Sequence, residues 1–284
     1  MNITHRRGPD FIGIGVQRSG TSWLFECLKE HEGVFLPQKE VHFFNNKYDR
    51  GVGWYESLFK IDDKDKDKDK ARGEITPDYL FNEYSIERIA QHYPYIKLII
   101  ILRDPFDRAY SAYNLFKSHG RFKDMTFEEA IKKDKWILEQ SLYSSQLERV
   151  FSLFSKEQVK IYDFEDISYR PLWLLQDVFE FIGVDANFQP SRFKERYNVS
   201  GFSALQDKFD LPRIQKSMNQ NKVGKQLLKL KRLSLVRQLK SWLLDRNHEE
   251  NLKDLHCSLV TRQIIKADLL KVSDMLNKSY EKWY

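Results

Sequence analysis

Residues 11–28 read Phe-Ile-Gly-Ile-Gly-Val-Gln-Arg-Ser-Gly-Thr-Ser-Trp-Leu-Phe-Glu-Cys-Leu, and they are the most informative part of the chain. The apolar run 11–16 predicts a buried strand, a glycine turn follows, and a helix is predicted to begin at Thr21. Backbone N–H groups and the positive end of the helix dipole converge at such a helix start. Thr21 stands where a nucleotide triphosphatase loop has its lysine, and Arg18 is the long cation of the turn. The stretch therefore predicts a phosphate-type anion site that is not a standard ATPase loop.

Composition indicates a folded globular protein. The chain has 284 residues, 41% of them hydrophobic and 14% aromatic, which is enough to bury a sizeable core. The net charge of +6 suits an anionic cofactor or acceptor, but it is small beside 47 basic and 41 acidic residues, so no nucleic-acid partner is expected. The two cysteines, Cys27 and Cys257, are predicted to be reduced thiols, since two cannot form a disulfide framework or a zinc cluster.

The first residues carry no targeting signal of a recognisable kind. Residues 1–9 are polar and basic, and no apolar stretch follows them as in a signal peptide. No window approaches the roughly 20 apolar residues of a membrane span. The expectation is a soluble, cytoplasmic protein.

Alternating strands and helices predict a doubly wound α/β fold. The run 96–102 is too continuously apolar to have one wet face, so a central parallel sheet covered on both sides is expected. A further strand is predicted at 159–163. Helices are predicted at 85–92, 107–117, 126–135, 140–154 and 171–183, and the segment 259–283 is predicted to be a packed terminal helix with Ile264, Leu269, Val272, Met275 and Leu276 on its apolar face.

Two regions depart from this pattern. Residues 62–70 alternate aspartate and lysine, which predicts a solvated loop tip and no metal site, because adjacent lysines compete for each carboxylate. Residues 202–250 are basic with interleaved leucines. This stretch is predicted to be a helical insertion packed on the core, and peripheral membrane contact through 222–243 is the alternative. Without a long linker, one domain over 1–284 is expected.

Four motifs in order resemble a known family. They are Gly15-Val-Gln-Arg-Ser-Gly-Thr-Ser-Trp23, Lys39-Glu-Val-His-Phe-Phe44, Gly73-Glu-Ile-Thr-Pro-Asp-Tyr79 and Leu102-Arg-Asp-Pro-Phe-Asp-Arg-Ala-Tyr-Ser-Ala-Tyr113. Together they resemble the sulfotransferases that use 3′-phosphoadenosine 5′-phosphosulfate (PAPS), in the branch of heparan sulfate and bacterial carbohydrate sulfotransferases. The resemblance implies a P-loop-like three-layer fold with a helical C-terminal extension. It also implies PAPS as cofactor, without a metal, and transfer to a hydroxyl of a carbohydrate or glycoconjugate.

The resemblance assigns cofactor contacts to three parts of the chain. The start of the first helix would hold the 5′-phosphate through backbone N–H groups and hydroxyls. Arg103 and Ser111 match the motif that clamps the 3′-phosphate, and an arginine fork suits a phosphate. A later loop would cover the nucleotide. The expected cofactor residues are Arg18, Ser19, Gly20, Thr21, Ser22, Trp23, Arg103, Ser111, Ser200 and Gly201.

Three residues are expected to carry the reaction. Glu40 stands at the family's catalytic glutamate and would act as base, and its apolar neighbours are expected to raise its proton affinity. A structural salt bridge to Lys39 is the alternative. His42 would orient Glu40 or the acceptor, or serve only as a wall residue. Arg18 would stabilise charge on the leaving group, because a guanidinium stays protonated at neutral pH.

One position departs from many polysaccharide-modifying relatives, which have a lysine shortly after the glutamate at Glu74. Ile75 or Thr76 stands there in this chain, so Arg18, Lys39 or the basic stretch would have to compensate. No histidine and carboxylate cluster has the spacing of metal ligands.

Two other functions remain open from the sequence. A P-loop nucleotide-dependent kinase would need a lysine in the loop, where Thr21 stands. A non-catalytic nucleotide-binding protein would not need Glu40.

Overall fold

The computed structural model describes residues 8–60, 70–194 and 258–284. The predicted loop at 62–70 lies almost wholly outside these residues, and the predicted insertion at 202–250 does so entirely. The described chain divides into two compact units. The first comprises residues up to 112, 136–194 and 263–284; the second comprises 113–135 and 258–262. The expectation of one domain over the whole chain stays a prediction.

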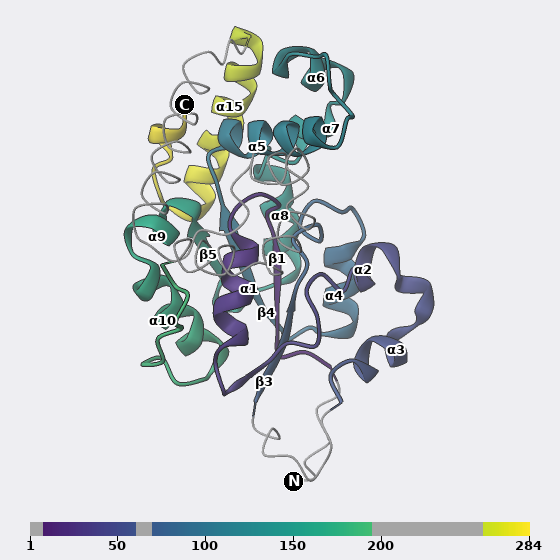
Figure 1. The fold of residues 1–284 in the computed structure, drawn as a ribbon, viewed down its shortest axis with the longest axis vertical. Coiled ribbons are helices and arrows are strands. Elements are labelled where there is room, and N and C mark those ends of the chain that lie inside the picture. Colours follow the sequence, from purple (N-terminus) through teal and green to yellow (C-terminus); the bar gives the residue numbers. More distant parts are fainter. Residues whose placement is uncertain (1–7, 61–69, 195–257) are drawn as a thin grey trace, which may run out of the picture. The chain divides into compact units, whose positions relative to one another are not determined.

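A five-stranded parallel sheet forms the centre of the first unit, as predicted (Figure 1). Its order is β2-β3-β1-β4-β5, so the strands that follow β1 in the chain lie on both sides of it. Such an arrangement creates a ligand-binding crevice at the carboxyl ends of the strands. The strands are β1 (Phe11–Gly15), β2 (Val34–Phe35), β3 (Ala71–Ile75), β4 (Lys97–Leu102) and β5 (Val159–Asp163).

Helices connect the strands at lengths close to those predicted. They are α1 (Thr21–Lys29), α2 (Phe43–Asn46), α3 (Val52–Ser57), α4 (Ser85–His92), α5 (Pro105–Ser118), α6 (Phe127–Lys133), α7 (Trp136–Glu139), α8 (Ser144–Leu153), α9 (Phe164–Tyr169), α10 (Pro171–Ile182) and α15 (Leu259–Leu276). Short 3₁₀ helices occur at Tyr48–Arg50, Lys156–Gln158 and Glu281–Trp283.

The two faces of the sheet bury separate hydrophobic clusters, which makes three layers. Alternate residues of β4 point to opposite faces, as the strand period requires. Ile99 and Ile101 pack with α1 and α10, whereas Leu98 and Ile100 pack with α4, α8 and α15. In Figure 1, α1 and α10 lie on one side of the strands and α4 lies on the other. Cys27 is fully buried on α1, and Cys257 lies outside the described residues, so the expectation of two reduced thiols stays a prediction.

The terminal helix buries the predicted face except at Ile264, since Leu269 and Val272 are buried and Met275 and Leu276 pack against the core. Ile265, Leu269 and Val272 are fully buried, whereas Ile264 is 43% exposed. Ile265 is spaced four and seven residues from Leu269 and Val272, so the helical period itself places Ile265, and not Ile264, on the buried face.

The second unit is small within its described part. Thr126 caps α6 with a reciprocal capping box to Glu129, and Tyr113, Phe122 and Phe127 pack their rings together. No helix of the described residues is long and apolar enough to cross a membrane.

Candidate active site

The turn between β1 and α1 has the geometry of an anion site. Arg18 and Gly20 both have left-handed backbones, with φ of 70° and 81°. A Cβ on Gly20 would lie 2.3 Å from Ile167 Cδ1, so glycine is needed there for space as well as for conformation. The first hydrogen bond of α1 runs from Leu24 N–H to Gly20 O (3.1 Å), and no side chain caps the helix. The amide groups ahead of Leu24 therefore point out of the helix start, where an anion can accept from them.

Two buried donors at this turn test whether it suits a phosphate. Ser19 is fully buried and Arg103 is 8% exposed. Within the described residues, Ser19 Oγ and Arg103 Nε have no hydrogen-bond partner. Buried polar groups are normally paired. These two donors and the start of α1 therefore fit phosphate oxygens, and PAPS would present two phosphates, one at the 5′ and one at the 3′ position.

Arg18 is joined to the second cofactor motif. Its Nε donates to Ser111 Oγ at 3.0 Å, and Arg103 Nη1 donates to the Arg18 carbonyl oxygen at 2.9 Å. Burial lowers the pKa of Arg18, and the charge of Arg103 lowers it further. Two guanidinium groups held this close repel each other, and an anion that contacts both would relieve the repulsion. The structure thus brings together three of the predicted cofactor residues.

Arg103 is oriented by side chains from several elements. Its guanidinium lies 4.5 Å from the centre of the Phe164 ring and 3.8 Å from Asp107 Oδ2, and Tyr143 Oη donates to its carbonyl oxygen at 2.8 Å. Asp104 instead accepts from the first amides of α5, while burial raises the pKa of this carboxyl to about 7. Arg103 is therefore held in place without a direct ion pair to its chain neighbour.

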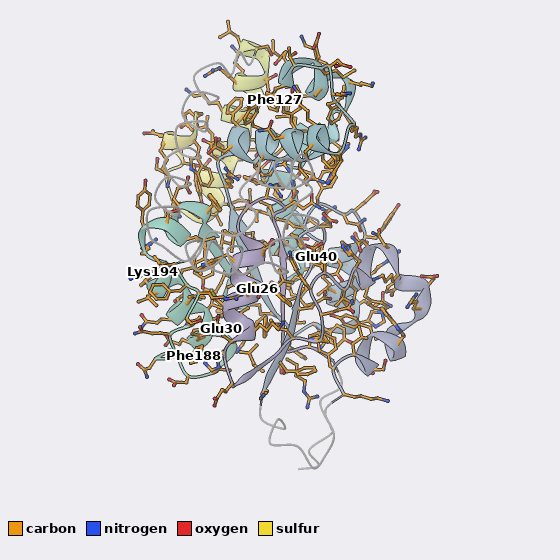
Figure 2. The ribbon with its side chains drawn as sticks, in the orientation of Figure 1. Glu26, Glu30, Glu40, Phe127, Phe188 and Lys194 are labelled. Atoms are coloured by element: carbon orange, nitrogen blue, oxygen red, sulfur yellow. The ribbon has the colours of Figure 1, made fainter. Side chains whose placement is uncertain are left out.

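Glu40 lies beside the anion turn. Its N–H donates to Ile75 O at 3.1 Å, at the carboxyl end of β3. The adjacent Lys39 donates from Nζ to Ser22 Oγ at 2.7 Å, in the first turn of α1. Figure 2 labels Glu40 and also Glu26, which lies on α1. The segment that carries Glu40 is thus hydrogen-bonded, through Lys39, to the helix whose N-terminus forms the anion site.

The electrostatics of Glu40 correct a prediction. The expected rise in proton affinity is wrong, because a hydrogen bond from His42 lowers the pKa of Glu40 and outweighs burial. His42 Nε2 lies 3.5 Å from Glu40 Oε2, and its Nδ1 lies 3.8 Å from Asp78 Oδ2. The hydrogen bond with Glu40 and the charge of Asp78 raise the pKa of His42, against burial and Lys47. Glu40 is therefore a carboxylate paired with an imidazole, and Lys39 is a weaker partner at 3.7 Å.

The backbone explains why the two side chains meet. Glu40 and His42 have φ of 55° and 58°, both in the left-handed region. Left-handed backbone is uncommon for residues other than glycine, and here it turns both side chains to one place. Val41 between them is fully buried in the core.

Three predicted cofactor residues have other outcomes. The Trp23 indole is buried and donates to Phe193 O at 3.0 Å, so its side chain serves packing and only its backbone N–H is at the helix start. Ser200 and Gly201 lie outside the described residues. Thr21 and Ser22 are in the first turn of α1, as expected.

The sequence did not anticipate the buried cluster around Glu74. This carboxylate is fully buried and accepts from the hydroxyls of Tyr55, Thr76 and Tyr79. A glutamate inside an apolar strand end, followed by hydroxyl residues, is the signal that could have revealed it. Thr76 therefore supplies a buried hydroxyl to this cluster. Among the described residues, no group of three His, Cys, Asp or Glu side chains could hold a metal.

Comparisons with known proteins identify the family of this chain. The family model for the sulfotransferase domain matches residues 8–227. The chain is 31% identical over 211 residues to the bifunctional heparan sulfate N-deacetylase/N-sulfotransferase 4 of Mus musculus, covering 64% of this chain and 23% of that protein. It is 31% identical over 212 residues to heparan sulfate glucosamine 3-O-sulfotransferase 5 of Mus musculus, covering 69% and 59%. The chain thus spans less than two thirds of these relatives.

A solved structure supports the fold. The sulfotransferase from Alicyclobacillus acidocaldarius superposes with a TM-score of 0.64 at 21% identity, covering 97% of this chain and 98% of that one. The matching family model spans well over half of the chain. The chain therefore belongs to the sulfotransferase family.

Proposed function

We propose that this chain transfers a sulfuryl group from PAPS to a hydroxyl group of a carbohydrate or glycoconjugate. The observation that carries the proposal is the 2.7 Å hydrogen bond from Lys39 to Ser22. It fixes the segment of Glu40 next to the helix start that suits a phosphate. Sulfuryl transfer to a hydroxyl requires a phosphate-binding site beside a carboxylate base.

The donor side relies on fixed cations and N–H groups. PAPS supplies the activated sulfuryl group, and its nucleotide phosphate leaves with added negative charge. The start of α1 and the Ser19 hydroxyl would hold that phosphate, with Arg18 stabilising the charge that develops on it. Arg103, with its free buried Nε, would bind the 3′-phosphate. The hydrogen bond from Arg18 Nε to Ser111 Oγ orients the guanidinium, which would therefore not have to move during the reaction.

The acceptor side relies on Glu40. Its pKa is lowered, so the side chain is ionised near neutral pH and can accept a proton from the acceptor hydroxyl. The side chain is 38% exposed, which leaves it accessible to a bulky acceptor. His42 then holds the carboxylate in one orientation through the contact at 3.5 Å.

Carbohydrate is proposed as the acceptor class because the two relatives described above are named for heparan sulfate. The test is a panel of sugars, glycolipids, phenols and tyrosyl peptides incubated with labelled donor. Label is expected in a sugar or glycolipid. Transfer only to phenols or peptides would contradict the carbohydrate acceptor while leaving sulfuryl transfer itself supported.

Ligand binding separates this function from a kinase. Adenosine 3′,5′-bisphosphate is expected to raise the melting temperature, because ligand at 100 times its Kd stabilises the fold by about 2.7 kcal/mol. For a chain of this size, that corresponds to roughly 5–10 °C in a thermal-shift measurement. ATP at the same concentration is expected to give a smaller shift. No shift with the bisphosphate, or a larger one with ATP and magnesium, would overturn the proposal.

The His42 contact predicts the pH dependence of turnover. Below the raised pKa of His42, the protonated imidazole holds the proton affinity of Glu40 low. As the pH rises through that pKa, the imidazole loses its charge and Glu40 becomes a stronger base. Turnover is therefore expected to rise with pH through a step above about 6.5, the ordinary histidine value.

Two variants identify the group behind that step in a pH profile of kcat. His42→Gln keeps a hydrogen-bond donor for Glu40 but does not titrate, so the step should disappear. Asp78→Asn should move the step to lower pH, because the charge of Asp78 raises the pKa of His42. A step that stays unchanged in His42→Gln would assign it to another group.

A further inference from the structure

Glu74 is a buried carboxylate surrounded by neutral donors. Tyr55 Oη and Tyr79 Oη donate to its Oε1 at 2.7 and 3.0 Å, and Thr76 Oγ1 donates to its Oε2 at 2.7 Å. The backbone N–H of Val41 also donates to it. The residue is 0% exposed, so each of these hydrogen bonds is shielded from water.

Two of the hydroxyls also accept from the segment with the proposed base. Tyr79 Oη accepts from Phe43 N–H at 2.8 Å, and Thr76 Oγ1 accepts from His42 N–H at 3.4 Å. The amide of Val41 is hydrogen-bonded to Glu74 itself. Three consecutive amides, those of residues 41–43, are therefore connected to Glu74 directly or through a hydroxyl. Glu40 N–H, just before them, is bound to the end of the same strand.

The direction of these bonds follows from Glu74 as the acceptor. A hydroxyl that accepts an amide N–H has its own proton left to donate, and in both cases the donation goes to Glu74. Burial raises the pKa of Glu74, and the hydrogen bonds that it accepts oppose this rise. Because both of its oxygens accept, Glu74 sets the direction of the hydrogen-bond chains through Thr76 and Tyr79.

This network accounts for a backbone that is otherwise unfavourable. Left-handed conformations at Glu40 and His42 persist only where the surroundings hold them. The amides between and after them are held through Glu74, Thr76 and Tyr79. We propose that Glu74 is a positioning residue, which through Thr76 and Tyr79 holds the segment 40–44 so that Glu40 faces the acceptor. This inference rests on the proposed sulfuryl transfer.

Tyr55 and Tyr79 form a matched pair for the test. Both are fully buried tyrosines that donate to the same oxygen of Glu74, but Tyr79 alone of the two accepts from the amide of Phe43. Tyr55→Phe and Tyr79→Phe each delete one donor to Glu74. Tyr79→Phe additionally releases the segment that carries the base.

Tyr79→Phe is expected to lower kcat by about 10²-fold, since displacement of a reacting group by 1 Å has an effect of that size. Tyr55→Phe is expected to stay within about 3-fold of the wild type, whatever its effect on melting temperature. Both variants should retain the wild-type Kd for adenosine 3′,5′-bisphosphate. Hydrogen exchange adds a readout independent of turnover: the amide of Phe43 should exchange faster in Tyr79→Phe and not in Tyr55→Phe.

Thr76 provides a second pair in case Tyr79→Phe fails to fold. Thr76→Ser keeps the hydroxyl and should retain kcat, whereas Thr76→Val loses it and should lower kcat. The positioning role would be overturned if the wild-type chain is active, Tyr79→Phe has the same kcat as Tyr55→Phe, and Thr76→Val has the same kcat as Thr76→Ser. Absence of transfer by the wild-type chain with every acceptor would instead overturn the proposed function.

Discussion

Replacing Glu40 by glutamine is expected to reduce sulfuryl transfer by about 10³-fold, because a positioned general base contributes roughly 10²–10⁴-fold. A carboxamide has the same shape but cannot take the acceptor proton. The affinity for adenosine 3′,5′-bisphosphate should change by no more than about twofold, since the interaction lost acts on the acceptor side. Single-turnover rates and bisphosphate titration measure the two effects separately.

A carboxylate elsewhere provides the control for Glu40. Glu26 is half-buried on α1 (Figure 2), whereas Glu40 lies between β2 and α2. Glu26→Gln removes the same charge and should retain wild-type turnover. If Glu40→Gln retained turnover within tenfold, Glu40 would lose its role, and its pairing with His42 would be structural.

The sequence predicted those strands whose own residues are mostly apolar. β1 and β4 are apolar runs, β5 carries Val159, Ile161 and Tyr162, and each of the three strands lies where it was predicted. β3 was not predicted, because Ala-Arg-Gly-Glu-Ile has no apolar run. Its glycine is explained by a neighbour, since a Cβ on Gly73 would lie 2.3 Å from the Phe11 ring. A strand whose residues are selected by contacts with distant parts of the chain is difficult to predict from its own sequence.

The site shows the same division between local and distant causes. Family motifs predicted Arg18, Arg103 and Ser111, and the structure brings them together across 93 residues of sequence. The proton affinity of Glu40 was predicted with the wrong sign, because its apolar neighbours in sequence suggested burial as the main effect. His42 reverses that sign through a contact that depends on left-handed backbone. Such backbone is imposed by tertiary hydrogen bonds, which residue spacing does not reveal.

Arg18→Met is expected to lower kcat by about 10²-fold, the lower end of the effect of removing one group that stabilises transition-state charge. Methionine is unbranched like arginine, so the left-handed backbone at this position is no less accessible to it. Bisphosphate affinity should fall less than kcat, because the leaving group gains charge only as the sulfuryl group departs. Steady-state kinetics with separate determination of Kd measure this difference.

Arg18→Lys separates the charge of Arg18 from its hydrogen bond to Ser111. Lysine keeps a cation but lacks the Nε that donates to Ser111 at 3.0 Å. If charge is what matters, Arg18→Lys should stay within about tenfold of the wild type, and Ser111→Ala should behave similarly. If both variants were as slow as Arg18→Met, orientation by Ser111 would be the main contribution.

An equal loss of kcat/KM and bisphosphate affinity in Arg18→Met, at unchanged kcat, would make Arg18 a ground-state binding residue. In that case the catalytic cation would have to be sought at Lys39, which already reaches the first turn of α1.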